Sequence, residues 1–175
     1  QHLVAATVEG LGGLDILVNN AGIARQGAVA DMSLADIDAL LDVNVRAAVL
    51  AAQAAIPHLG AGGRIVLIGS SLADRSVAAG VTVYSMTKSA QSALTRGLAR
   101  ELGPRDITVN LVQPGATDTE MNPADGGHAE GLRAQTPLGR YGQPEDVAAA
   151  VAFLAGPAAR QITGTVLTVD GGLNA

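Results

Sequence analysis

The sequence has no cysteine and almost no aromatic residues. The lack of cysteine excludes disulfides, thiol catalysis and cysteine-ligated metal sites, and it is typical of a cytoplasmic protein. Aromatic residues make up 2% of the chain, so Ala, Val, Leu and Ile must fill the core, and no aromatic platform for nucleic-acid bases is expected. The three histidines, His2, His58 and His128, have no spacing suited to a shared metal ion, so we expect no metal site.

Charged residues and long apolar runs are also scarce. Charged residues make up 15% of the chain, and the formal net charge of -5 disfavours nucleic acid or an anionic membrane as a partner. No uninterrupted apolar run reaches the ~18 residues that a membrane helix needs. The first residues, Gln1 to Val4, have no basic signal-peptide region, and they lack Met and lie inside an expected helix. We therefore expect a piece of a longer cytoplasmic protein without a nucleic-acid or membrane partner.

Short apolar runs alternate with longer Ala-rich segments along the chain. The short runs are typical of strands buried on both faces, and the longer segments are typical of helices. Ser33 is the expected N-cap of one helix, and Pro144 fits the first turn of another. The predicted strands are Asp15–Val18, Arg64–Ile68, Asp106–Val112 and Thr165–Val169. The predicted helices are His2–Leu11, Ser33 to about Leu59, Tyr84–Leu102 and Pro144 to about Leu154, with a loop over Gly69–Val83 and an irregular segment over Ala116–Arg140.

This alternation predicts an α/β fold, in which about four parallel strands form an open, doubly wound sheet. The length of 175 residues suits a single domain over residues 1–175. Ligands of such sheets bind beyond the carboxyl ends of the strands. Three of those ends carry Asn20-Ala21-Gly22, Ser70-Ser71 and Pro114-Gly115, so we expect the candidate polar groups to gather at one edge of the sheet.

Tyr84 and Lys88 are the most informative pair in the sequence. They lie four residues apart in a predicted helix, so their side chains share one face. An ammonium near a phenol favours the phenolate, so we expect Lys88 to lower the Tyr84 pKa from its usual value of about 10. Ser71 lies thirteen residues before Tyr84, and Asn44 lies further upstream. This set predicts an oxidoreductase that reduces a carbonyl or oxidises an alcohol, with Tyr84 as the proton donor.

Several motifs, taken together in order and spacing, make the sequence resemble the short-chain dehydrogenase/reductase family over essentially its whole length. They are Asn19-Asn20-Ala21-Gly22, Asn44, Ser71, the run from Tyr84 to Lys88, Pro114-Gly115 with Thr119, Pro137–Asp146 and Asp170-Gly171-Gly172. The run Val112–Thr119, followed by Asn122-Pro123, looks closest to the 3-oxoacyl-carrier-protein-reductase-like subset. That subset includes a bacterial biofilm-dispersal member reported to bind cyclic di-GMP.

The resemblance implies a Rossmann-like fold, NAD or NADP as cofactor, and a small carbonyl or secondary alcohol as substrate. Tyr84 would exchange the proton, and Lys88 would lower its pKa and hold the nicotinamide ribose. Ser71 would hydrogen-bond the substrate oxygen, which makes Ser70 the structural serine of the pair, and Asn44 would hold a water. The implied cofactor-binding residues are Asn20, Ala21, Gly22, Tyr84, Lys88, Pro114, Gly115, Thr117 and Thr119. The resemblance also implies a homo-oligomer, either a dimer or a tetramer, assembled through the Tyr84–Leu102 helix and the helix before it.

The sequence departs from the family in one respect, because the glycine-rich pyrophosphate loop is not in it. Such a loop follows a strand, whereas Gly10–Gly13 and Gly60–Gly63 both precede predicted strands. Roughly the first third of a usual member is missing, and the strand at Asp15–Val18 would become an exposed apolar edge. The chain is either a trimmed version of a full enzyme or a stable truncated form with poor cofactor affinity. The alternative to the oxidoreductase is a non-catalytic ligand-binding or regulatory protein, for example one that binds a cyclic dinucleotide.

Overall fold

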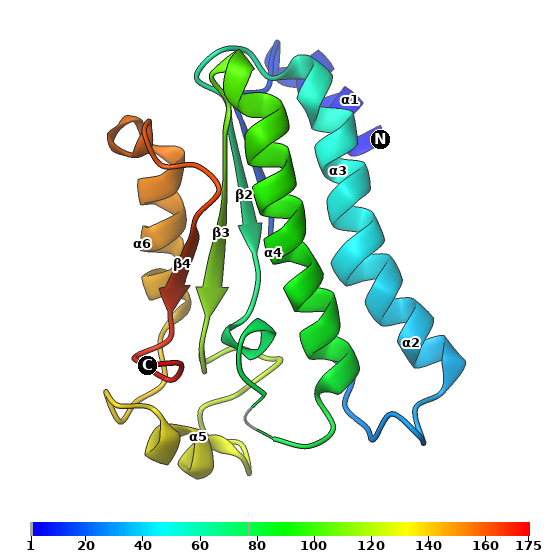
Figure 1. The fold of residues 1–175 in the computed structure, drawn as a ribbon, viewed down its shortest axis with the longest axis vertical. Helices are drawn as coiled ribbons and strands as arrows, with labels where there is room; N and C mark the ends of the chain where they lie inside the picture. Colours follow the sequence, from blue (N-terminus) through cyan, green and yellow to red (C-terminus); the bar gives the residue numbers. More distant parts are fainter. Residues whose placement is uncertain (1, 77) are drawn as a thin grey trace.

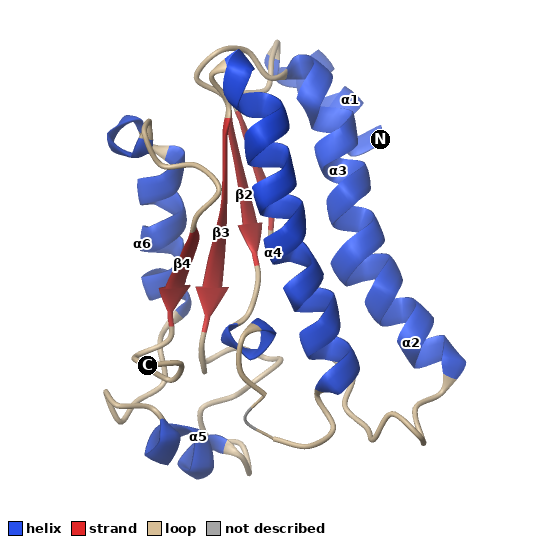
Figure 2. Cartoon of the chain, viewed as in Figure 1, coloured by secondary structure: helices blue, strands red, loops and turns tan. Residues whose placement is uncertain are grey.

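Four parallel strands form a single sheet at the centre of the protein (Figures 1 and 2). The computed structural model describes residues 2–76 and 78–175. The strands are β1 (Ile16–Asn19), β2 (Arg64–Ile68), β3 (Thr108–Pro114) and β4 (Val166–Val169), and they lie in the order β1-β2-β3-β4. The predicted α/β fold with about four parallel strands is therefore confirmed.

Helices cover both faces of the sheet, as the predicted doubly wound arrangement requires (Figure 1). On one face, α3 (Ala47–Ala55) and α4 (Thr82–Leu102) pack against the strands, and α1 (His2–Leu11) packs on α3. On the other face, α6 (Pro144–Ala155) packs against β2, β3 and β4. Pro144 begins this last helix, as predicted.

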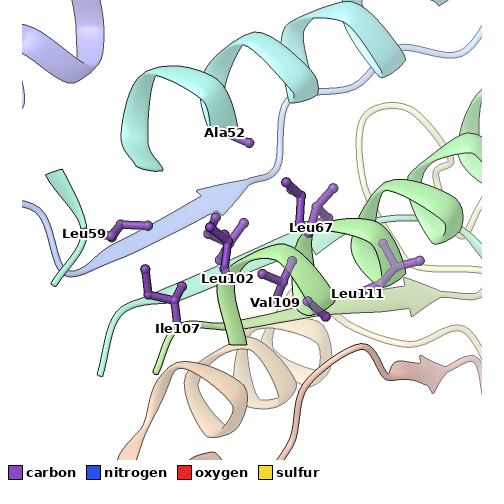
Figure 3. Close-up of a cluster of buried hydrophobic side chains, with 10 residues drawn as sticks. Ala52, Leu59, Leu67, Leu102, Ile107, Val109 and Leu111 are labelled. Atoms are coloured by element: carbon purple, nitrogen blue, oxygen red, sulfur yellow. The ribbon is translucent and has the colours of Figure 1, made fainter. Parts of the chain in front are cut away.

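The two faces of the sheet carry two separate apolar cores. Because successive side chains of a strand point to opposite faces, β2 and β3 contribute alternate residues to each core. The core under α3 and α4 contains Ala52, Leu59, Ile65, Leu67, Leu98, Ala99, Leu102, Ile107, Val109 and Leu111 (Figure 3). The core under α6 contains Val66, Val112, Leu154 and Ala159. Burial on both faces explains the continuous apolar run Ile65–Ile68 in β2.

The predicted helix from Ser33 to about Leu59 is a continuous helical run with a local change of pitch. It begins at α2 (Leu34–Leu41), where the Ser33 hydroxyl accepts the Asp36 N–H at 3.1 Å, so the predicted N-cap is confirmed. The run continues through a π-turn, η1 (Asp42–Arg46), then α3 and the short turn η2 (Ile56–His58). A π-turn inside an α-helix is rare and frequently marks a functional site.

This helical run is also apolar. By length and composition alone, Leu34–His58 passes a test for a membrane-spanning helix, although 28% of its most apolar window is buried in the protein. Its buried residues include Ala48, Ala52 and Ala55, which lie on the face of α3 turned toward the sheet. A helix that packs on a sheet can pass the same test, so the expected absence of a membrane partner stays a prediction.

Several details differ from the sequence prediction. β1 begins and ends one residue later than the predicted Asp15–Val18, and α4 begins at Thr82, two residues before Tyr84. The segment predicted as irregular contains α5 (Ala129–Gln135), because the Gly- and Pro-rich part ends before a run of good helix formers. β3 continues to Pro114, because its last residues pair with β4. The predicted loop after β2 contains a short 3₁₀ turn, η3 (Ser71–Ala73). Two further short turns, η4 (Gly103–Arg105) and η5 (Pro157–Ala159), follow α4 and α6.

Strand β1 forms an exposed apolar edge, as the sequence predicts. In the described residues, its one neighbouring strand is β2. The exposed fractions of Ile16 and Val18 are 43% and 41%, whereas the Ile65 and Val66 side chains of β2 are fully buried. A shallow groove beside β1 is lined by Val18, Asn20, Ile68, Pro144, Val147, Ala148, Val151 and Ala152. A bare apolar edge of this kind promotes pairing with another strand or aggregation.

Candidate active site

The predicted site residues lie near the carboxyl ends of the strands and around the first turns of α4. These strand ends point toward the end of the molecule that carries α5 and the long loops (Figure 1). Asn20, Ala21 and Gly22 follow β1, and Gly115 follows β3. Asn19, the last residue of β1, donates from Nδ2 to the main-chain oxygen of Ala48 at 3.3 Å, so it joins the strand to α3.

Asn44 joins three parts of the chain. It is fully buried in the π-turn η1. Its Oδ1 accepts the N–H of Ile23 at 2.9 Å, and its Nδ2 donates to the main-chain oxygen of Ile23 at 2.9 Å and to Thr87 Oγ1 at 3.1 Å. Thr87 Oγ1 in turn donates to the main-chain oxygen of Tyr84 at 2.7 Å. The Asn44 side chain therefore holds the segment after β1 against α4. Its implied role in holding a water stays a prediction.

Lys88 is almost completely buried beside this junction. Its Nζ donates to the main-chain oxygen of Ile68 at 3.0 Å, and burial lowers the Lys88 pKa from 10.5 to about 8. Gly22 lies against the ammonium, because a Cβ atom at Gly22 would lie 3.1 Å from Lys88 Nζ and 3.4 Å from Asn44 Oδ1. A side chain at position 22 would require the ammonium to shift by a few tenths of an ångström.

Tyr84 lies one helical turn before Lys88, but its pKa differs from the sequence expectation. Lys88 Nζ lies 5.9 Å from the centre of the Tyr84 ring. Burial raises the Tyr84 pKa above 10, and a hydrogen bond with the Ser70 side chain only partly opposes that rise. The Tyr84 pKa is therefore raised and not lowered as expected, because the loss of hydration dominates and the ammonium is directed at Ile68. Tyr84 therefore keeps its proton at neutral pH, as a proton donor must.

The two adjacent serines have different surroundings. The Ser70 side chain is the one that hydrogen-bonds with Tyr84, and its Oγ also accepts the N–H of Leu72 at 3.2 Å. Ser71 begins η3, and its main-chain oxygen accepts Asn174 Nδ2 at 2.7 Å. A spacing of thirteen residues selects Ser71, but a loop can differ by one residue in length, so spacing alone cannot separate neighbours.

The remaining predicted cofactor residues lie around the segment after β3. Gly115 donates its N–H to Val169 at 2.9 Å, and a Cβ atom there would lie 2.6 Å from Asp170 Cα, so this position admits only glycine. Pro114 ends β3, and Thr117 Oγ1 donates to the main-chain oxygen of Gly115 at 3.2 Å. Thr119 lies in a tight turn. In the described part of the chain, no hydrogen bond joins Thr117 or Thr119 to Tyr84 or Lys88.

A polar cluster near α5 was not predicted from the sequence. The Tyr141 hydroxyl donates to Asn122 Oδ1 at 3.3 Å, and the Arg133 guanidinium lies 5.3 Å from the centre of the Tyr141 ring. Asp118 Oδ1 accepts the N–H of Ala124 at 2.8 Å. Composition cannot reveal this cluster, because its members are up to 23 positions apart.

Among the residues that the structure describes, no cluster of His, Asp and Glu could hold a metal ion.

The family follows from comparison with known proteins. A family model described as "Enoyl-(Acyl carrier protein) reductase" matches residues 1–174. The chain belongs to the short-chain dehydrogenase/reductase family. The predicted family membership is therefore confirmed, and with it the Rossmann-like fold.

Three members of the short-chain dehydrogenase/reductase family illustrate the match. The "Cyclic-di-GMP-binding biofilm dispersal mediator protein" of Escherichia coli (strain K12) is 45% identical over 175 residues, which cover 100% of this chain and 74% of the relative. The "3-oxoacyl-[acyl-carrier-protein] reductase FabG" of Aquifex aeolicus (strain VF5) is 41% identical, with coverage of 92% and 66%. The crystal structure of a short-chain dehydrogenase from Burkholderia cenocepacia J2315 in complex with NADP has a TM-score of 0.98 and 57% identity, with coverage of 99% and 71%.

The predicted nicotinamide cofactor agrees with that NADP complex. The residues in this chain fit the nicotinamide-ribose end of such a cofactor. Gly22 leaves open the space beside the buried Lys88 ammonium that a Cβ atom would fill, and the Tyr84 hydroxyl lies one turn away. The sequence has no glycine-rich loop that follows a strand and opens a helix, so these 175 residues do not supply the usual pyrophosphate site.

Replacing Gly22 with Ala is expected to disturb Lys88. The new methyl group would meet the ammonium at 3.1 Å, and we expect the free energy of unfolding to fall by about 1–3 kcal/mol, as is usual when a packed site is overfilled. Urea denaturation measures the change. Gly60→Ala is the matched control, because its Cβ would have no neighbour within 4 Å. Equal stability of the two variants would contradict the close packing of Gly22 on Lys88.

Proposed function

We propose that the protein is an NAD(P)-dependent oxidoreductase that interconverts a carbonyl and a secondary alcohol, with Tyr84 as proton donor and acceptor. One observation carries the proposal. The Tyr84 hydroxyl lies beside the Ser70 side chain and one helical turn from the buried Lys88, and burial raises its pKa above the usual value. A serine, a tyrosine and a lysine placed in this way suit proton transfer to an oxygen next to a reacting carbon.

In the reduction, Tyr84 gives its proton to the substrate carbonyl oxygen and is left as a phenolate. The Ser70 hydroxyl donates a hydrogen bond to the same oxygen while negative charge develops there. Lys88 would stabilise the phenolate and would hold the nicotinamide ribose when the cofactor is bound. The bound cofactor supplies the hydride, and the protein supplies orientation and the proton. In the oxidation, the same groups act in reverse, and Tyr84 takes the proton from the alcohol.

We propose Ser70, rather than the predicted Ser71, as the serine that contacts the substrate oxygen, because Ser70 hydrogen-bonds with Tyr84. Ser70→Ala is expected to lower kcat about a hundredfold, the usual effect of removing one hydrogen-bond donor to a developing negative charge. Ser71→Ala is the matched control and is expected to keep most of the activity. Initial rates of NADPH oxidation measure both variants. A larger loss in Ser71→Ala than in Ser70→Ala would restore the original assignment.

The second candidate function is binding of a cyclic dinucleotide without catalysis. The name of the Escherichia coli relative favours it. Titration of the folded protein with NADPH, NADH and cyclic di-GMP separates the two functions. Binding of NADPH or NADH supports the oxidoreductase, whereas binding of cyclic di-GMP alone, with neither nicotinamide cofactor bound, would replace it with the second candidate.

The proposed oligomer, a dimer or a tetramer, would use the outer faces of α3 and α4. Val49 and Leu50 of α3 have exposed fractions of 42% and 43%, and a shallow groove between the helices is lined partly by Ile56 and Leu94. Apolar side chains exposed on adjacent helices suit contact with a second copy. A cytoplasmic location and a small-molecule substrate belong to the same proposal.

A further inference from the structure

Gln91 is a buried amide on α4 that none of the proposed catalytic steps uses. It lies three residues after Lys88 and has an exposed fraction of 3%. Its Nε2 donates to the main-chain oxygen of Asn44 at 2.8 Å, across 47 residues of sequence. The sequence analysis did not select it, because a single glutamine in an Ala-rich helix carries no motif.

The partner of this hydrogen bond lies in the π-turn. A π-turn departs from the regular pattern of main-chain hydrogen bonds in a helix, and every buried main-chain oxygen there needs a donor. Gln91 supplies a donor to the oxygen of Asn44, while Thr87 bonds with the side chain of the same residue at 3.1 Å. Gln91 and Thr87 are four residues apart on α4, so their side chains lie on one face of this helix, and each forms a hydrogen bond with Asn44.

Hydrogen bonds also link Asn44 to the segment after β1, which lies next to Lys88. Asn44 bonds with both the N–H and the main-chain oxygen of Ile23. The next residue upstream is Gly22, where a Cβ atom would lie 3.1 Å from Lys88 Nζ. The position of Asn44 along the helical run therefore sets how closely this segment approaches the ammonium.

Gln91 makes this contact at a cost. Its Oε1 is buried and has no hydrogen-bond partner among residues 2–76 and 78–175. A buried polar atom without a partner loses its hydration and gains nothing in return, whereas a leucine here would fill similar space without that loss. The Gln91 side chain thus fixes the position of Asn44, although its unpaired oxygen lowers the stability of the fold.

We propose that Gln91 is a positioning residue, which fixes Asn44 in the π-turn and through it the Gly22–Ile23 segment over Lys88. The role in proton transfer rests on the proposed function, but the geometric effect can be measured without any cofactor. A failed cofactor titration would therefore leave this inference standing, and an unaltered geometry in the variant would leave the proposed oxidoreductase standing.

Hydrogen exchange of the Gln91→Leu variant tests the proposal. The Ile23 amide is bonded to Asn44, and the Leu111 amide is bonded to the main-chain oxygen of Thr165 in the sheet. We expect exchange at Ile23 to accelerate at least tenfold more than exchange at Leu111. We also expect the NMR resonance of the Lys88 side chain to move. Equal acceleration at the two amides, with an unchanged Lys88 resonance, would reduce Gln91 to a general contribution to stability and overturn the proposal.

Two further variants keep the test decisive. Ser92→Ala is the matched control, because Ser92 is the next buried residue of α4 and its Oγ has no hydrogen-bond partner in the described residues. It should leave the relative exchange of Ile23 and the Lys88 resonance unchanged. If Gln91→Leu does not fold, Thr87→Val removes the other hydrogen bond to Asn44. This variant should accelerate hydrogen exchange at the Ile23 amide selectively. Thr87→Val without selective acceleration at Ile23 would contradict the proposed linkage.

Discussion

Replacing Tyr84 with Phe is expected to reduce the reductase rate by about a hundredfold to ten-thousandfold, because the variant keeps the ring and loses the transferable proton. The fold should survive, since the side chain remains in place and loses only the hydrogen bond with Ser70. Initial rates of NADPH oxidation measure the loss, with a 3-oxoacyl thioester as the probe substrate. This substrate is chosen from the name of the Aquifex aeolicus relative.

Tyr141→Phe is the matched control for Tyr84→Phe, because the sequence contains only these two tyrosines. The Tyr141 hydroxyl bonds with Asn122 near α5, so its loss removes a phenol without touching the proton donor. We expect this control to keep most of the activity. Full activity in Tyr84→Phe, or equal losses in the two variants, would refute Tyr84 as the proton donor.

The raised Tyr84 pKa predicts how the rates of reduction and oxidation change with pH. Burial keeps the phenol protonated through neutral pH, so the reduction, which needs the phenol, should not lose its proton donor there. The oxidation needs the phenolate, whose fraction increases tenfold with each unit of pH below the pKa. The rate of alcohol oxidation by wild-type protein should therefore rise toward alkaline pH more steeply than the rate of reduction.

The second large effect concerns Lys88 and the stability of the fold. Its pKa is about 8 in the folded protein and 10.5 as an unperturbed side chain. The unfolded chain therefore binds more protons than the folded chain between these values, and stability rises as pH rises. At neutral pH the buried ammonium opposes folding, and that cost is relieved as Lys88 loses its proton. From about pH 7 to about pH 9.5, we expect a gain of about 2 kcal/mol from this residue.

Urea denaturation of wild-type protein and the Lys88→Met variant measures that gain. Methionine fills similar space without a charge, so the variant retains the pH dependence of every other group and loses that of Lys88. The difference in unfolding free energy between the two proteins should change by about 2 kcal/mol between the two pH values. A difference that is independent of pH would show that Lys88 keeps an ordinary pKa and is not buried as the structure has it.

Strands β2 and β3 could be predicted from sequence because each is buried on both faces, and the partly exposed β1 and β4 could be predicted because each is also a short apolar run. In β2, Ile65–Ile68 form an uninterrupted apolar run, and the glycines on either side mark the ends of the strand. The helix that carries Tyr84 and Lys88 could be predicted for a similar reason, since residues four apart share a face. The π-turn could not, because a change of pitch inside a helix leaves no mark on composition or periodicity.

The details of the site depend on contacts between distant segments, which spacing cannot supply. The packing of Gly22 on Lys88 joins residues 66 positions apart, and the Gln91 bond to Asn44 spans 47. The direction of the Tyr84 pKa shift depends on the burial of the phenol in the folded protein, which outweighs the opposing hydrogen bond with Ser70. Which of Ser70 and Ser71 faces Tyr84 depends on the path of the loop after β2. Two adjacent serines give no sequence signal for that path.

The side chain of Lys88 gives the most direct test of a nicotinamide site in this protein. Lys88 is the only lysine in the sequence, so protein labelled with ¹³C at lysine Cε gives a single side-chain resonance of this type. Titration with NADPH should move that resonance progressively, while the same additions of cyclic di-GMP should leave it in place. A resonance that stays unchanged through the whole NADPH titration, in protein whose fold is intact, would contradict the proposed oxidoreductase.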